Sequence, residues 1–216
     1  MYSVLCALFS VLCFQDDTIR SLEQRMAANP TEALALLRQA ALSPEEQPRE
    51  WKRLATLACD LQERRLAQLG EDQVADLANT YAKDLADRPA AERVQKNWLR
   101  MRLEALGAGE GQTRLHYARL TLRWLGDQET AKRLCREVFQ ATDPSAAAQM
   151  LKKENPTATE VRQLLGPPQD RARQILYRRH LEQWVYHTPP LRIEFDCASG
   201  QEPQILTVQT LSSKKP

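Results

Sequence analysis

The hydrophobic periodicity of this chain changes once, near Asn155, and that change limits the folds the sequence can adopt. Before it, apolar residues recur at helical spacing, as with Val74, Leu77 and Tyr81. After it, apolar and charged residues alternate in short runs. An amphipathic helix repeats its apolar face every ~3.6 residues, whereas a half-buried strand repeats it every second residue. We therefore predict a mostly α protein, with a helical domain at residues 16–155 and a small α+β module at residues 156–216.

Signals for helix ends divide the first region into several short helices. Gly70, Gly107 and Gly126 each follow an apolar-periodic segment, where a left-handed residue commonly ends a helix. Asp143-Pro144 has the pattern of an N-cap residue followed by a proline in the first turn. Short helices with brief connections favour antiparallel neighbours, so we expect a helical solenoid or bundle. Some segments look like tetratricopeptide helices, but a sustained period of about 34 residues is absent.

The last quarter of the chain predicts one short helix and a three-stranded antiparallel meander. A capping box at Thr157–Glu160 would open a helix over Val161–Leu165. Residues 175–186, 191–195 and 205–211 are rich in aromatic, β-branched or alternating apolar residues, so each is expected to form a strand. On this reading, Trp184 and Tyr186 share a face that points inward.

The same module resembles the BamE (SmpA/OmlA) family of small envelope proteins. The family's T-x3-V-x3-L-G-x-P motif is matched by Thr157, Val161, Leu165, Gly166 and Pro168. Its later W-x-Y and L-x-I-x-F strands are matched by Trp184, Tyr186, Leu191, Ile193 and Phe195. The resemblance implies an α+β fold, an exported location and binding to other proteins, with no catalytic residues to carry over. The chain lacks the family's lipobox and has a large helical region in front, so membership in an outer-membrane assembly machinery does not follow.

The N-terminal segment differs in composition from the rest of the chain. Residues 1–14 contain no charged side chain, whereas charges are dense from Asp16 onward. This apolar run is too short to span a bilayer but fits the hydrophobic part of a secretory signal. It has no Lys or Arg at its start and no A-x-A cleavage site, so a buried N-terminal element is the alternative. We expect residues 1–15 to be a signal peptide and the protein to be periplasmic or envelope-associated; without a signal it would be cytoplasmic.

Few side chains are arranged for chemistry. No C-x-x-C motif occurs, and Cys59 and Cys135 lie in helical patterns where we expect them to be buried. His180, His187 and Cys197 all lie in the small module and could meet as a Cys–His pair or part of a metal site, although their spacing does not require it. We therefore predict no enzymatic activity, no cofactor and no metal.

The most unusual functional feature is a cluster of basic residues in the small module: Arg171, Arg173, Arg178 and Arg179. It could form a positive strip that contacts an acidic protein or the phosphates of lipid or nucleic acid. The alternative is a set of solvated arginines, partly neutralised by Asp170 and Glu182.

Taken together, these features favour a non-enzymatic, exported or envelope-associated scaffold whose partners are other proteins. The net charge of +2 is too small for a general polyanion binder, so nucleic acid is not the expected partner. Peripheral membrane contact stays open. The alternative is a cytosolic helical adaptor or nucleic-acid-associated protein that uses the basic strip between Arg171 and Arg179.

Overall fold

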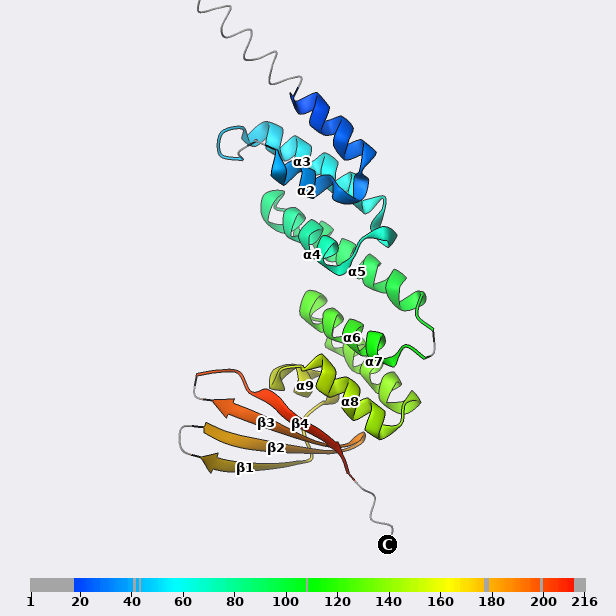
Figure 1. Cartoon of the computed structure of the whole chain (residues 1–216), viewed down its shortest axis with the longest axis vertical. Coiled ribbons are helices and arrows are strands. Elements are labelled where there is room, and N and C mark those ends of the chain that lie inside the picture. The colour runs from blue at the N-terminus through cyan, green and yellow to red at the C-terminus, as the bar shows by residue number, and fades with distance from the viewer. Residues whose placement is uncertain are drawn as a thin grey trace, which may run out of the picture. The chain divides into compact units, whose positions relative to one another are not determined.

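The computed structural model describes residues 18–211, except 41, 43, 108, 177–178 and 199. The predicted signal peptide at residues 1–15 lies outside the described residues. The chain divides after Met101 into two compact units. The first is helical, and the second combines helices with one antiparallel sheet, so the predicted mostly α class is confirmed (Figure 1).

The first unit consists of short helices. A helical segment at residues 18–28 is followed by η1 (Pro30–Glu32), α2 (Ala33–Gln39), α3 (Pro48–Glu63), η2 (Leu66–Gln68), α4 (Glu71–Asn79), the π-helical η3 (Thr80–Asp84) and α5 (Arg88–Glu104). Their apolar stripes form the core of the unit, in which Cys59 is fully buried as expected. The indole N–H of Trp98 donates a hydrogen bond to the Leu69 carbonyl at 3.0 Å and so ties α5 to the loop before α4.

One predicted helix end in this unit is wrong. Gly70 has φ −75° and is the N-cap of α4, with its N–H donating to the Gln73 side chain at 2.9 Å. A residue that begins the next helix needs an extended backbone, not a left-handed one. In the second unit, Gly126 has φ +62° and ends α6, as predicted, whereas Gly107 is not left-handed and that predicted helix end is wrong.

The second unit places four helices before a four-stranded sheet. The helices are α6 (Gly111–Leu125), α7 (Gln128–Ala141), α8 (Pro144–Glu154) and α9 (Ala158–Leu165). The strands are β1 (Asp170–Leu176), β2 (Arg179–His187), β3 (Pro190–Ala198) and β4 (Gln204–Thr210). They pair antiparallel in the order β1-β2-β3-β4, and α8 and α9 lie along one face of the sheet (Figure 1).

The predicted three-stranded meander is therefore corrected to four strands. The additional strand is β1. Of residues 175–186, interpreted as one strand, residues 175–176 end β1 and residues 179–186 belong to β2. In β1 every residue before Leu176 is exposed. An edge strand with no buried side lacks the alternation of apolar residues by which strands are recognised. Because this segment is rich in exposed arginines, its sequence did not predict a strand.

A single hydrophobic core joins α6–α9 to the sheet. Helix α9 begins at a capping box in which the Glu160 N–H donates to Thr157 Oγ1 at 3.2 Å and the Thr157 N–H donates to Glu160 Oε2 at 2.9 Å. The helix is one turn longer at its start than the predicted Val161–Leu165 and ends at Gly166, whose φ is +86°. The core draws buried residues from both sides of residue 155: Leu115, Leu134, Leu151, Val161, Trp184, Tyr186, Leu191, Ile193 and Phe195. The compact unit thus begins well before the boundary suggested by composition.

Candidate functional site at the open end of the sheet

The register of the sheet gathers five polar side chains at one end of its core-facing side. His180 on β2 pairs with Cys197 on β3, and Glu182 pairs with Arg173 on β1. Arg171 lies opposite the buried Trp184. Residues directly opposite one another in an antiparallel pair project to the same face. The polar group is therefore continuous with the aromatic core.

Glu182 is the centre of this group. Its side chain is only 5% exposed, and its two oxygens accept hydrogen bonds from Arg171 (Nη2, 2.6 Å), Arg173 (Nη2, 2.7 Å) and the Trp184 indole N–H (3.1 Å). Burial raises the pKa of Glu182, but the hydrogen bonds from Arg171, Arg173 and Trp184 outweigh it and lower the pKa to about 2. Glu182 is therefore a fixed, buried carboxylate at any physiological pH.

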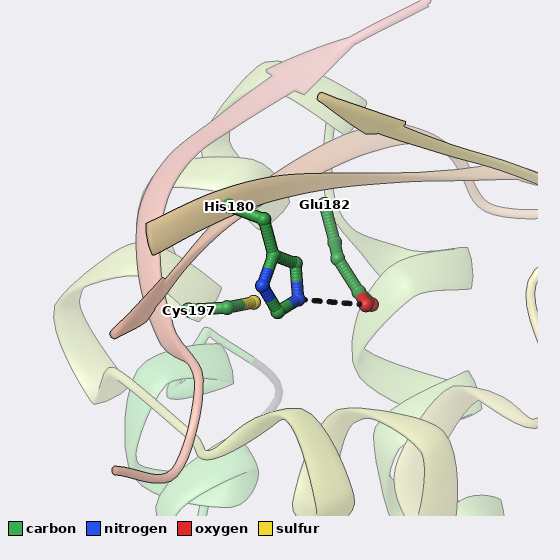
Figure 2. Close-up of side chains that lie close together, drawn as sticks. All are labelled: His180, Glu182 and Cys197. Atoms are coloured by element: carbon green, nitrogen blue, oxygen red, sulfur yellow. Dashed lines mark hydrogen bonds and ion pairs between the residues drawn. The ribbon is translucent and has the colours of Figure 1, made fainter. Parts of the chain in front are cut away.

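The imidazole of His180 lies beside both the Cys197 thiol and this carboxylate (Figure 2). Its Nε2 is 3.3 Å from Glu182 Oε1, and Nδ1 lies on the side of the sulfur (Figure 2). The nitrogen, oxygen and sulfur donor atoms all lie within 4.8 Å of one another. Burial, and then the negative charge of Glu182, raise the pKa of the Cys197 thiol. The resting site therefore holds a protonated thiol beside a histidine.

A histidine, a thiol and a carboxylate are also ligands for zinc and similar metals. Both Glu182 oxygens already accept N–H donors, and two guanidinium cations stand beside them. The arrangement therefore fits a hydrogen-bonded cluster around Glu182 better than a chelate, and the Cys197 thiol beside it donates to the Phe195 carbonyl at 4.0 Å.

An open hollow of about 580 Å³ adjoins the group and gives solvent a route to it. Cys197, His180 and Arg173 line it together with the last residues of β1. Ile175 stands on its rim and is 82% exposed. Among the described residues, Leu206 is the one other large apolar side chain that is exposed.

The predicted basic strip is not one surface. Arg171 and Arg173 lie on the core-facing side and share Glu182, whereas Arg179 lies on the opposite side and donates to Asp196 Oδ2 at 3.1 Å. Alternation along the two strands causes this separation, because residues of opposite parity project to opposite faces. Arg178 lies outside the described residues.

Of the residues considered for a thiol or metal site, the structure brings together His180 and Cys197 but not His187. His187 lies at the other end of β2, where its Nε2 is 3.4 Å from Asp170 Oδ2. The sequence interpretation missed the central role of Glu182. The sequence did indicate that Glu182 is buried, because it lies two and four residues before Trp184 and Tyr186 on the same strand and so shares their inward face.

Most of the residues that carry the BamE resemblance lie at the ends of α9 or in the core of the second unit. Thr157 and Gly166 flank α9, and the Tyr186 hydroxyl donates to the Gly166 carbonyl at 3.2 Å. Val161, Trp184, Tyr186, Leu191, Ile193 and Phe195 are buried, which confirms the inward face, whereas Leu165 and Pro168 are half-buried. Cys59 and Cys135 are buried as expected, and burial raises the pKa of Cys135 to about 12.

No family model, curated protein or solved structure matches the chain. The BamE resemblance therefore rests on its motif residues alone. Among the residues that the structure describes, no helix is both long enough and apolar enough to cross a bilayer.

Proposed function

We propose that this chain is a non-enzymatic, exported or envelope-associated scaffold that binds an extended segment of another protein along the free edge of β1. The observation that supports this most directly is the exposure of β1. Every residue from Asp170 to Ile175 is exposed, and the strand lies at the edge of the sheet.

The backbone of β1 is suited to accept another strand. It pairs with β2 in continuous register from Asp170 to Leu176, so the edge is straight and regular over the length of an ordinary strand. Alternate residues of an edge strand direct N–H and C=O groups away from the sheet, and a partner strand can satisfy them. Strand addition thus supplies affinity without any special side chain.

The side chains on β1 define the partner's chemistry. Ile175 offers an exposed apolar contact, and Arg171 and Arg173 together bring two positive charges to the single carboxylate of Glu182. The carboxylate of β1 itself, Asp170, lies 3.4 Å from His187 Nε2 at the start of β1, so the two arginines share only Glu182. We expect a partner segment with an apolar side chain near Ile175 and a carboxylate near the arginines.

Export is a separate part of the proposal, supported by the uncharged segment at residues 1–14 and by the family resemblance. If the segment is a cleaved signal, the mature protein begins between about Phe14 and Asp17, where the apolar run ends. N-terminal sequencing of protein purified from its own cells tests this. Intact Met1 on cytosolic protein would contradict it.

Site-specific photo-crosslinking in the cells that make this protein tests the β1 edge. One crosslinker replaces Gln174 on β1, and a control crosslinker replaces Gln209 on β4; both glutamines are exposed and lie on the side of the sheet opposite the core. We expect a discrete protein adduct at position 174 that is weaker at 209 and is reduced by Ile175→Asp. Equal yields at the two positions, or no adduct at 174, would contradict the proposal, and an adduct removed by nuclease would support the nucleic-acid alternative.

A further inference from the structure

The described cysteines have different surroundings. Cys59 and Cys135 lie inside helices, each with no exposed surface, and burial raises the pKa of each thiol to about 12. Cys197 instead lies on β3 opposite a histidine and lines an open hollow. It is the described cysteine with both a neighbouring base and a route to solvent.

The order of groups around Cys197 is that of a nucleophile, its base and the group that orients the base. A ring nitrogen of His180, the Cys197 sulfur and a Glu182 oxygen lie within 4.8 Å of one another, and Nε2 is 3.3 Å from Glu182 Oε1 (Figure 2). A carboxylate that accepts a hydrogen bond from Nε2–H fixes the tautomer in which Nδ1 is unprotonated. That nitrogen is the one on the side of the sulfur. The same division of roles activates nucleophilic cysteines and serines on unrelated folds.

The surroundings keep each member of this group in place. Glu182 is held as an anion by Arg171, Arg173 and Trp184, so it does not compete for the proton. The ring of His180 is about one-third exposed toward the hollow. The charged or titratable groups that act on the pair from the neighbouring strands are Arg171 and Arg173 on β1 and Asp196 on β3.

We propose that Cys197 is a reactive thiol that forms mixed disulfides by exchange with small disulfides, with His180 as its base. The Cys197 sulfur attacks one sulfur of the disulfide while His180 Nδ1 takes the thiol proton. A bond forms between the two sulfurs, and the disulfide bond breaks. The departing thiolate receives the proton from the imidazolium, so one thiol and one disulfide yield another thiol and another disulfide. No further oxidant is needed.

A protonated resting thiol is consistent with this chemistry. Burial raises the pKa of Cys197, so the thiolate is scarce near neutral pH and reaction depends on proton removal by the base during attack. The rate is then expected to level off at a pH below the titration of the thiol itself. A cysteine that reacts without a base would show a rate that keeps rising up to its thiol pKa.

The test is the reaction of the full chain, under native conditions, with two small disulfides: dithiobis(nitrobenzoate) and oxidised glutathione. Mass spectrometry of peptides assigns each mixed disulfide to its cysteine. We expect Cys197 to react at least about tenfold faster than Cys59 and Cys135, and His180→Asn to slow Cys197 by about tenfold or more. His187→Asn is the matched control on the same strand and leaves the rate unchanged.

Slow rates at Cys59 and Cys135 in the variant show that it remains folded. If His180→Asn unfolds the chain, the pH–rate profile of the unmodified protein decides alone. A Cys197 rate equal to those of Cys59 and Cys135 would overturn the proposal. An unchanged rate in a folded His180→Asn variant, or a rate that rises with pH without a plateau, would also overturn it.

Discussion

Two buried carboxylates in the second unit are each held by a pair of arginines, but their surroundings differ. Glu160 lies between α6 and α9, where Arg119 Nη2 is 3.1 Å from Oε2 and Arg123 binds Oε1. Arg119 is itself buried, with its side chain only 9% exposed, and it also binds Glu154. Glu182 lies at the end of the sheet, and its arginines are about half exposed.

The neighbours of each carboxylate indicate its role. Glu160 also accepts a hydrogen bond from the Thr157 N–H at the start of α9, so its contacts join the first turn of α9 to α6. Glu182 contacts His180, which faces a thiol and an open hollow. The same Arg–Glu chemistry thus stabilises packing in one place and orients a titratable side chain in the other. An ion pair alone does not distinguish these roles. They differ in the exposure of the site to solvent and in the other side chain that the carboxylate contacts.

The largest loss of stability is expected from substitution of Trp184, which joins the hydrophobic core to Glu182. Trp184 is 2% exposed, its ring packs on Phe195 with centroids 4.5 Å apart, and its N–H binds Glu182. Trp184→Ala should lower the free energy of unfolding by about 3–5 kcal/mol. Trp184→Phe keeps most of the packing but leaves Glu182 one donor short, so about 1 kcal/mol is expected. Denaturant titration of the full chain measures both, and a Trp184→Ala variant of unchanged stability would mean that the aromatic face is a binding surface.

Substitution of one arginine beside each carboxylate tests whether the arginines of Glu160 contribute more to stability than those of Glu182. Arg119→Met leaves Glu154 and Glu160 buried with fewer cations, so a loss of about 3 kcal/mol is expected. Arg171→Met leaves Glu182 with Arg173, and the lost side chain was half exposed, so about 1 kcal/mol is expected. The thermal midpoint of each variant, compared with the unmodified chain, provides the measurement. Equal losses would show that both arginine pairs have the same structural weight.

The dependence of stability on pH should reflect Glu182. Its pKa is lowered in the folded chain from 4.5 to about 2, so folding favours its charged form. The resulting stabilisation is complete above the unfolded pKa and is lost as the pH falls through about 2, at a cost on the order of 3 kcal/mol. Glu182→Gln should flatten the decline in thermal midpoint across this acid range. A decline of the same steepness in both proteins would contradict the low pKa.

The smallest effect concerns two glycines with different backbones. Gly166 has φ +86° with open space around its missing Cβ, so Gly166→Ala introduces backbone strain without a clash. A loss of about 1 kcal/mol is expected. Gly70 has φ −75° and similar space, and as the N-cap of α4 it is better than alanine, so Gly70→Ala should lower stability by about 0.5 kcal/mol. Thermal melts of the two variants compare them directly; a larger loss at Gly70 would contradict the assigned conformations.

Local signals predicted much of this fold. The capping box at Thr157, the end of α6 at Gly126 and the inward face of Trp184 all depend on residues close in sequence. The extra strand was not predicted, because β1 is defined by pairing with β2 and has no apolar period of its own. Gly70 was misassigned because one glycine can end a helix or begin the next.

The candidate site was predicted only in part for a related reason. The pairing of His180 with Cys197 depends on the register between β2 and β3, which their separation in sequence does not specify. The arginines looked like one strip because neighbours in sequence lie on opposite faces of a strand. Their shared partner, Glu182, was interpreted as a flanking neutralising charge, although its phase with Trp184 indicated burial.

The most direct test of the difference between the two carboxylates is the rate at which Cys197 forms a mixed disulfide in Glu182→Gln and in Glu160→Gln. Each substitution removes one buried charge of the same kind, and slow reaction of Cys59 and Cys135 verifies that the core stays closed in both. We predict that Glu182→Gln slows Cys197 by about tenfold and shifts its pH–rate profile, while Glu160→Gln leaves both unchanged. Equal rates in the two folded variants would contradict the assignment of Glu182 as the group that orients His180.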